Sequence, residues 1–216
     1  MIDEKVLYFI EYDLQAIALI FMAVMYSIKA YQLSKLPMPW EKAEKKGSPG
    51  RGVRSSYAAI FMPWSMESSR KHIWRWLGFA LYHVGALVAI VNTFTYPFAP
   101  DMMTRPVRVV FAILIAPAAI VGLLKLIHRL STKALRVIST PDDYFSLVTL
   151  EFFFVFGVLA LWTDAPLWRM LYFLVTAFFL FYVPFSKISH YVYFFFARYL
   201  TGKRYGWRGV IPLKKS

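Results

Sequence analysis

Long apolar stretches alternate along the chain with short segments in which charged residues gather. Each stretch approaches or exceeds the roughly 20 predominantly apolar residues that a helix needs to cross the hydrocarbon core of a bilayer. A helix satisfies its own backbone hydrogen bonds, which lipid cannot do, so such stretches favour helices. The predicted spans cover residues 6–30, 77–98, 107–127, 145–162 and 170–190. The pattern therefore predicts an all-α fold, an integral membrane bundle of five transmembrane helices forming a single domain over residues 1–216.

The composition supports this interpretation and narrows the chemistry. The 216 residues are 59% hydrophobic and 19% aromatic, which is more apolar than a soluble domain of this size. The chain contains no cysteine, which excludes disulfides, thiolate metal sites and cysteine-ligated iron–sulfur clusters within it. If the protein carries electrons, other side chains must hold the cofactor.

The net charge of +13 is distributed unevenly along the chain. In a soluble protein such an excess would point to nucleic acid. Most Lys and Arg residues lie in a loop at residues 31–70, in the loop after the third span and in the tail at residues 198–216, while the other two connections contain only Arg105, Arg108 and Arg169. The positive-inside rule then places the N-terminus outside and the C-terminus in the cytoplasm, with no nucleic-acid partner. The basic loop and tail suit a soluble subunit or anionic lipid.

Two of the four histidines fall within or at the end of predicted spans. Ionisable side chains in a span are costly and indicate function. The second and fifth spans run in opposite directions, so His83 and His190 both lie in the cytoplasmic half. At ~1.5 Å per residue, His83 is about 9 Å inside its boundary and His190 is close to its own. Two histidines on different helices at comparable depth are what bis-histidine haem ligation needs. Alternatively, each histidine hydrogen-bonds a neighbouring helix.

Other polar side chains have weaker signals. His72 and His128 are solvated interfacial residues or, alternatively, ligands of a second haem between the second and third helices. Glu151 lies inside the fourth span, where a carboxylate relays a proton from quinol chemistry or pairs within the bundle. Arg129 and Lys187 are placed to bind haem propionates or to extend toward the lipid headgroups.

Three motifs, in this order, resemble a known family. They are "YHVG" at residues 82–85, "LRVISTPDDYFSL" at residues 135–147 and "PFSKISH" at residues 184–190, and the likeness covers about residues 70–200. The chain resembles the cytochrome b (gamma) subunit of respiratory nitrate reductase and its relatives in heterodisulfide-reductase-like complexes, including the complex associated with dissimilatory sulfite reduction. The second motif is more similar to the latter group.

The resemblance implies a set of haem ligands. In this family two helices carry four histidines that bind two b haems, and His83 and His190 match the pair nearer the cytoplasm. The other pair falls here at Asn92 or Thr93 and at Tyr172, which cannot bind iron in the family manner. One haem b is therefore expected, and two only if other histidines take part. The outer Tyr172 is also a candidate, with the carboxylate of the fourth span, for contact with quinone or its protons.

The expected function is that of a membrane-anchoring b-haem subunit in a prokaryotic cytoplasmic (inner) membrane. It would carry electrons between menaquinone or another quinone and a cytoplasmic iron–sulfur subunit of a larger respiratory complex. Chemistry on the terminal substrate would belong to another subunit, so no catalytic residue is predicted here. The alternative is a haem-free membrane anchor for a soluble redox complex. A small transporter is less favoured, because the spans lack the paired, Gly- or Pro-broken helices typical of transporters.

Overall fold

The computed structural model describes residues 2–37, 48–65 and 67–205. Within these ranges the regular structure is helical and no strand occurs. Five described helical segments are long and apolar enough to cross a membrane: Glu4–Lys35, Ile73–Phe98, Arg105–Ser131, Pro141–Thr163 and Pro166–Phe185. The predicted all-α fold with five such helices is confirmed, whereas the orientation of the termini stays a prediction. Residues 38–47 of the predicted basic loop and 206–216 of the tail lie outside the described residues.

The fifth apolar segment ends earlier than the sequence analysis placed it. It stops at Phe185 rather than at residue 190, because Pro184 has no backbone N–H and its ring collides with the preceding turn of a helix. The chain passes through two short 3-10 turns before a new helix starts at His190. This histidine therefore begins a separate helix instead of ending the fifth span.

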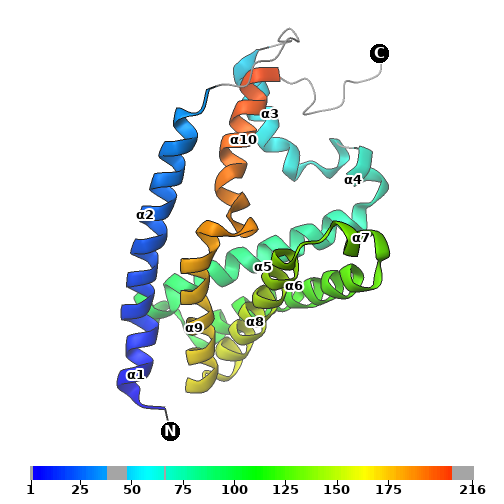
Figure 1. Ribbon diagram of the computed structural model, residues 1–216. Helices are drawn as coiled ribbons and strands as arrows, with labels where there is room; N and C mark the ends of the chain where they lie inside the picture. The colour runs from blue at the N-terminus through cyan, green and yellow to red at the C-terminus, as the bar shows by residue number, and fades with distance from the viewer. Residues whose placement is uncertain (1, 38–47, 66, 206–216) are drawn as a thin grey trace. The chain divides into compact units, whose positions relative to one another are not determined.

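The described chain forms two compact units. The first comprises Met1–Ile28 and Phe79–Ile188, and the second comprises Lys29–Gly78 and Ser189–Ser216. The labelled elements, in chain order, are α1 (Glu4–Tyr8), η1 (Phe9–Asp13), α2 (Leu14–Lys35), α3 (Pro49–Ala58), η2 (Ala59–Phe61), η3 (Pro63–Ser65), α4 (Glu67–Lys71), α5 (Ile73–Phe98), η4 (Pro100–Met102), α6 (Arg105–Ser131), α7 (Lys133–Ile138), α8 (Pro141–Thr163), α9 (Pro166–Tyr182), η5 (Val183–Phe185), η6 (Lys187–Ser189) and α10 (His190–Tyr205) (Figure 1).

In the first unit the long helices pack around an aromatic core. Helix α6 packs against α8, and α8 packs against α9. Phe154, Tyr172 and Phe173 are fully buried between them. Helix α5 approaches α6 closely at Gly85, where an added Cβ would overlap the Ala118 side chain, so this glycine serves helix packing.

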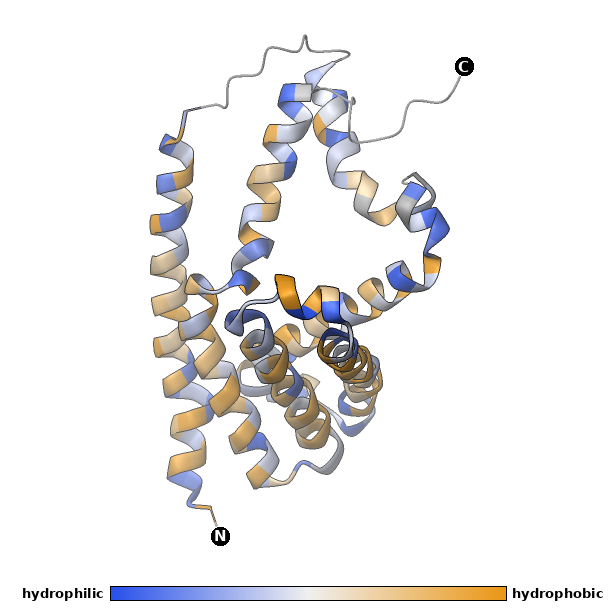
Figure 2. Ribbon diagram, turned by 45° about the vertical axis from the view of Figure 1, so that its right-hand side comes forward, coloured by the Kyte–Doolittle hydropathy of each residue, from blue (hydrophilic) through white to orange (hydrophobic). Residues whose placement is uncertain are grey.

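The outer surfaces of these helices are apolar. Figure 2 shows apolar residues along most of the length of the long helices, and large side chains such as Ile20, Ile113 and Leu124 are at least 60% exposed. Aliphatic side chains facing outward in this way are expected where lipid is the solvent.

Local signals in the sequence explain several helix ends. Helix α8 starts at Pro141 with Thr140 as its N-cap, and the side chains of Thr140 and Asp143 form a capping box. At its other end Asp164 adopts a left-handed conformation with φ of 55°. Asp tolerates this conformation better than most residues, which lets the chain turn directly into α9.

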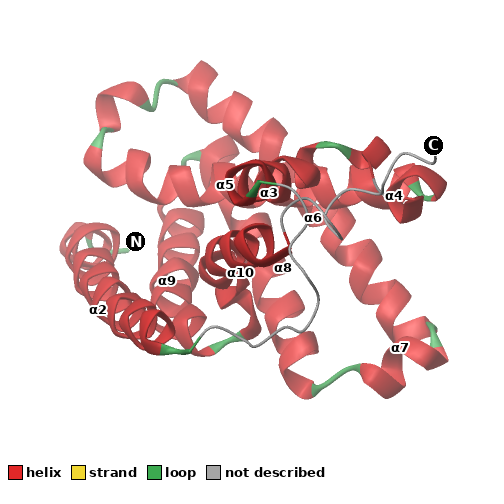
Figure 3. Cartoon of the chain, turned by 90° about the horizontal axis from the view of Figure 1, so that it is seen from above, coloured by secondary structure: helices red, strands yellow, loops and turns green. Residues whose placement is uncertain are grey.

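In the second unit, helix α3 lies beside α10, as Figure 1 and Figure 3 both show. The two helices touch at Gly202, where a side chain would overlap the backbone of Val53. The Tyr57 hydroxyl donates a hydrogen bond to the Phe195 carbonyl at 2.7 Å. These contacts fix the pair of helices to each other.

Candidate functional site

His83 lies on the surface of α5 with one ring nitrogen already engaged. Its Nδ1 is 2.8 Å from the carbonyl oxygen of Phe79 in the preceding turn. A carbonyl can only accept a hydrogen bond, so Nδ1 carries the proton and the lone pair of a neutral ring is on Nε2. Iron-ligating and zinc-ligating histidines are usually held in this way, by donation from the second nitrogen to a carbonyl or carboxylate. The local geometry of His83 is compatible with an axial ligand, and the ligation itself stays a prediction.

His190, the predicted partner, is the first residue of α10 and is exposed. His83 belongs to the first unit and His190 to the second, so their joint ligation of a haem stays a prediction. Among the described residues no group of three or more His, Cys, Asp and Glu side chains could hold a metal ion. A haem with two axial histidines does not need such a group.

The other two histidines are exposed, and their pairing also stays a prediction. His72 lies between α4 and α5 in the second unit, whereas His128 lies near the end of α6 in the first. The Nδ1 atom of His128 is 3.3 Å from the Thr132 hydroxyl. Nothing in the local geometry of these histidines favours ligation over the solvated role.

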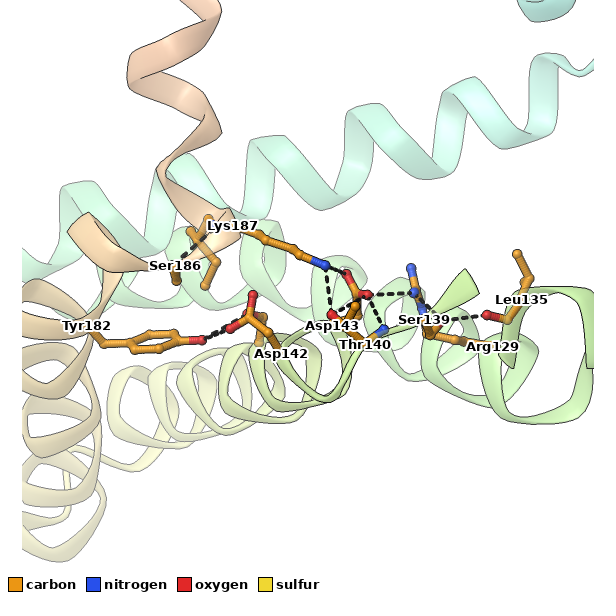
Figure 4. Close-up of polar contacts among 11 residues, drawn as sticks. Arg129, Leu135, Ser139, Thr140, Asp142, Asp143, Tyr182, Ser186 and Lys187 are labelled. Atoms are coloured by element: carbon orange, nitrogen blue, oxygen red, sulfur yellow. Dashed lines mark hydrogen bonds and ion pairs between the residues drawn. The ribbon is translucent and has the colours of Figure 1, made fainter. Parts of the chain in front are cut away.

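Arg129 and Lys187, the predicted propionate-binding cations, meet at the same carboxylate. Lys187 Nζ donates to Asp143 Oδ1 at 3.1 Å and to the Thr140 hydroxyl at 2.8 Å (Figure 4). Arg129 Nη1 lies 3.8 Å from Asp143 Oδ2 and donates to the Ser139 hydroxyl at 2.6 Å. The structure thus places the two cations beside one carboxylate, at a contact between the "STPDDY" and "PFSKIS" segments.

Tyr172, a candidate for contact with quinone, lies inside the packed core. Its hydroxyl donates to the Ala89 carbonyl at 2.7 Å and lies 3.1 Å from the hydroxyl of Thr93. Its ring stacks on Phe153, with centroids 5.3 Å apart. The two positions that the resemblance aligns with an outer ligand pair, Thr93 and Tyr172, therefore contact each other.

Asn92, the other position considered for that ligand, is fully buried. It lies near the Tyr172 hydroxyl, but neither its amide nitrogen nor its oxygen makes a hydrogen bond to a described residue. A neutral amide in this state loses the energy of its hydrogen bonds to water without replacement. The sequence indicated that Asn92 lies within a span, but it did not indicate that the amide lacks hydrogen-bond partners.

Glu151 lies on α8 in a small polar cluster on the helices of the first unit. Its Oε1 atom is buried without a hydrogen-bond partner, and so is the hydroxyl of Tyr82. Both side chains converge on Gly122 of α6, where an added Cβ would overlap Glu151 Oε1 and lie 3.0 Å from Tyr82 Cε2. Lys125 Nζ lies 4.0 Å from the centre of the Tyr82 ring. The carboxylate can therefore accept a proton, and no described side chain neutralises it through a direct ion pair.

A charged network that the sequence pattern did not predict joins the N-terminal helix to the bundle. Arg169 Nε and Nη2 donate to the two oxygens of Glu11 at 2.8 and 2.6 Å. Arg169 also lies over the Tyr96 ring, with its Cζ 5.2 Å from the ring centre. Tyr96 donates to Asp164, and Arg108 forms an ion pair with the same aspartate. Opposite charges at the same ends of predicted spans are the signal that could have suggested these pairs.

Asp164 is held ionised by this network. Burial would raise the pKa of Asp164, but hydrogen bonds from Tyr96 and Arg108 outweigh it and hold the pKa below its usual range.

A π-helical turn, η1, positions Glu11 toward α9. Gln15 supports the same contact, because its amide nitrogen donates to the carbonyls of Ile10 and Phe173 at 3.0 and 2.8 Å. The network is well suited to fixing helices and offers no open ligand position.

Comparisons with known proteins add a distant similarity. No family model matches the chain, and no solved structure matches it. A curated protein of Nitratidesulfovibrio vulgaris (strain Hildenborough), described only as "Protein", is 26% identical over 166 residues, a region that covers 72% of each chain. Identity at this level indicates that most of the chain has a bacterial counterpart, and it assigns neither a family nor a function.

Proposed function

We propose that this protein is a membrane-anchoring b-haem subunit that carries electrons between a membrane quinone and a cytoplasmic iron–sulfur subunit. The observation that carries the proposal is the contact between Thr93 on α5 and Tyr172 on α9, 3.1 Å between hydroxyls. The resemblance aligns these positions with a ligand pair that faces one haem. Their contact supports the proximity of α5 and α9 that the proposal needs.

In this proposal His83 and His190 hold a single haem b. The tautomer that Phe79 imposes on His83 supports the first ligand. A haem bound there supplies a one-electron conduit, and the protein supplies its ligands, a low-dielectric surrounding and nearby charge. Arg129 is the cation available to propionates, because Lys187 is already engaged by Asp143 and Thr140. His72 and His128 remain candidates only if a second haem is found.

Tyr172 and Glu151 are the two candidates for accepting the protons of a quinol. Tyr172 is fully buried and its hydroxyl is engaged with Ala89 and Thr93, so it serves packing in the outer half. Glu151 has a buried oxygen without a partner, which supports it as the acceptor of a proton released when a quinol is oxidised. The quinone, menaquinone or another, would then react on the Glu151 side of the bundle. The membrane is proposed to be a prokaryotic cytoplasmic membrane, in agreement with the bacterial origin of the similar protein.

The haem-free anchor is the second candidate, and a specific observation favours it. Tyr172 stands at one of the two positions that the resemblance aligns with the outer ligand pair, and its ring is stacked on Phe153 and packed against Gly157. A packed tyrosine in place of a haem ligand supports a chain that binds no haem and has only the anchoring role. Both candidates share the soluble iron–sulfur partner, so the discriminating property is bound haem.

The test is the ratio of haem to protein in purified material, together with reduced-minus-oxidised spectra. The proposal expects one b-type haem per chain, lost or converted to high spin in His83→Ala and in His190→Ala. His128→Ala is the matched control, because this histidine is also exposed on a helix, and it should leave the haem unchanged. A second haem that disappears in His128→Ala or His72→Ala would extend the site. A folded preparation without haem would leave the anchor as the function.

A further inference from the structure

The helical path of the chain is interrupted between α9 and α10. This interruption, here the α9–α10 break, comprises residues 183–189 and contains the two short turns η5 and η6. Pro184 causes it by removing a backbone donor. Inside the break, Ser186 donates its hydroxyl to the Val183 carbonyl at 3.2 Å and accepts from the Ile188 N–H at 3.1 Å. The break is therefore an ordered connection with bonds of its own.

Two adjacent aspartates at the start of α8 hold the chain just before this break and within it. Asp142 Oδ1 accepts a hydrogen bond from the hydroxyl of Tyr182, the last residue of α9, at 2.5 Å. Asp143 Oδ1 accepts from Lys187 Nζ, beyond the proline, at 3.1 Å. Figure 4 shows the two aspartates side by side, one directed toward Tyr182 and the other toward Lys187.

The carboxylate that holds Lys187 is itself fixed in place. Its second oxygen accepts from the Thr140 N–H at 2.7 Å and from the Thr140 hydroxyl at 2.9 Å. Lys187 Nζ also reaches that hydroxyl at 2.8 Å, so the ammonium has two acceptors that the helix cap keeps in place. The Lys187 side chain is 55% exposed, and ion pairs in such surroundings add little to stability. The main effect of this contact is therefore to fix the position of the chain at Lys187.

We propose that Asp142 and Asp143 are positioning residues for His190, which begins α10 three residues after Lys187. The inference rests on the proposed function, in which His190 is an axial ligand. Consecutive Cα atoms are ~3.8 Å apart, so a held Lys187 leaves the histidine only a short tether. Without these two aspartate contacts, here called the brace, only the bonds within the break would restrain the chain after α9, and the imidazole would be presented over a wider range of positions.

The experiment removes the brace without touching the aspartates, because Asp143 also caps α8. The full chain carrying Lys187→Met together with Tyr182→Phe is purified, and its haem content, spin state and helix content are measured. Lys133→Met, at an exposed lysine of α7, is the matched control, and Lys187→Arg is the conservative variant. His190→Gly, with and without added imidazole, shows what loss of this ligand alone looks like.

The double variant should keep its helix content and bind haem but lose part of the low-spin signal, and added imidazole should restore that signal. Lys187→Arg and Lys133→Met should match the unmodified protein. A low-spin spectrum unchanged in the double variant would overturn the inference, and so would a defect that imidazole does not restore although it restores His190→Gly. If the double variant does not fold, Lys187→Met alone, which keeps both the cap and the Tyr182 bond, decides in the same way. Absence of haem from the unmodified protein would instead overturn the proposed function.

Discussion

Replacing Glu11 by glutamine is expected to destabilise the bundle, because it breaks the ion pair between the N-terminal helix and α9. Two nitrogens of Arg169 donate to the two oxygens of the Glu11 carboxylate, at 2.8 and 2.6 Å. The Glu11 side chain is only 4% exposed, whereas that of Arg169 is 25% exposed. A glutamine amide can still accept one hydrogen bond, but it leaves the guanidinium without a counter-charge.

The loss of stability in Glu11→Gln depends on how well the protein accommodates the unpaired charge of Arg169. Removing one partner of a buried ion pair typically costs about 3–5 kcal/mol. Arg169 is partly hydrated and lies 5.2 Å from the centre of the Tyr96 ring, which offsets part of the loss. We therefore expect Glu11→Gln to lower the free energy of unfolding by about 2–3 kcal/mol. The double variant Glu11→Leu with Arg169→Leu buries no unpaired charge and should be more stable than the single variant.

The assay is unfolding by SDS in mixed micelles, followed by circular dichroism and tryptophan fluorescence. The matched control is Glu67→Gln, which breaks an ion pair with Lys71 of similar length, 2.7 Å, whose side chains are both 68% exposed. Breaking this exposed pair should cost no more than about 1 kcal/mol. Equal effects of Glu11→Gln and Glu67→Gln would refute the reasoning from burial. A double variant less stable than Glu11→Gln would show that the charges themselves stabilise the bundle.

Two further predictions concern other polar contacts of the first unit. Gly122→Ala should cost about 1–3 kcal/mol, because the new methyl group overlaps Glu151 Oε1, and Glu151→Ala in the same chain should recover much of the loss in the SDS assay. Burial raises the pKa of Asp164, but hydrogen bonds from Tyr96 and Arg108 outweigh this effect and lower the pKa. The ionised Asp164 therefore stabilises the fold above the unfolded-state pKa of about 3.9, and this stabilisation is lost as the pH falls through the lower folded-state pKa. Asp164→Asn should remove this acid dependence from the unfolding midpoint, and an unchanged dependence would contradict it.

The helices were predictable because hydropathy and caps act locally. Apolar stretches of sufficient length identified all five segments, and Thr140 with Pro141 marked the start of α8. The fifth segment ends at Phe185, earlier than its apolar composition predicts, because Pro184 interrupts it. The lost backbone donor at that residue outweighs the apolar composition of its neighbours.

The contacts between helices were less predictable, because hydrophobic periodicity does not identify which helices are neighbours. Glu11 and Arg169 are 158 residues apart, and their pairing depends on the packing of the first helix against α9. The motifs containing Asp143 and Lys187 were recognised separately, and their direct contact was not. Both residues fell near the same predicted boundary, so opposite charges at a shared boundary were the available signal.

The distribution of polar partners identifies the position at which chemistry is best sought. In lipid the hydrophobic effect does not drive helices together, so close packing at small residues and polar contacts between helices determine the pairing. At one end of the first unit Glu11 and Asp164 are each satisfied by arginine, and at the other Asp143 is satisfied by Lys187. Glu151 differs, because a buried oxygen of its carboxylate has no hydrogen-bond partner among the described residues. An unsatisfied carboxylate destabilises a bundle, so under the proposed function Glu151 is the residue at which exchange of a proton is to be tested first.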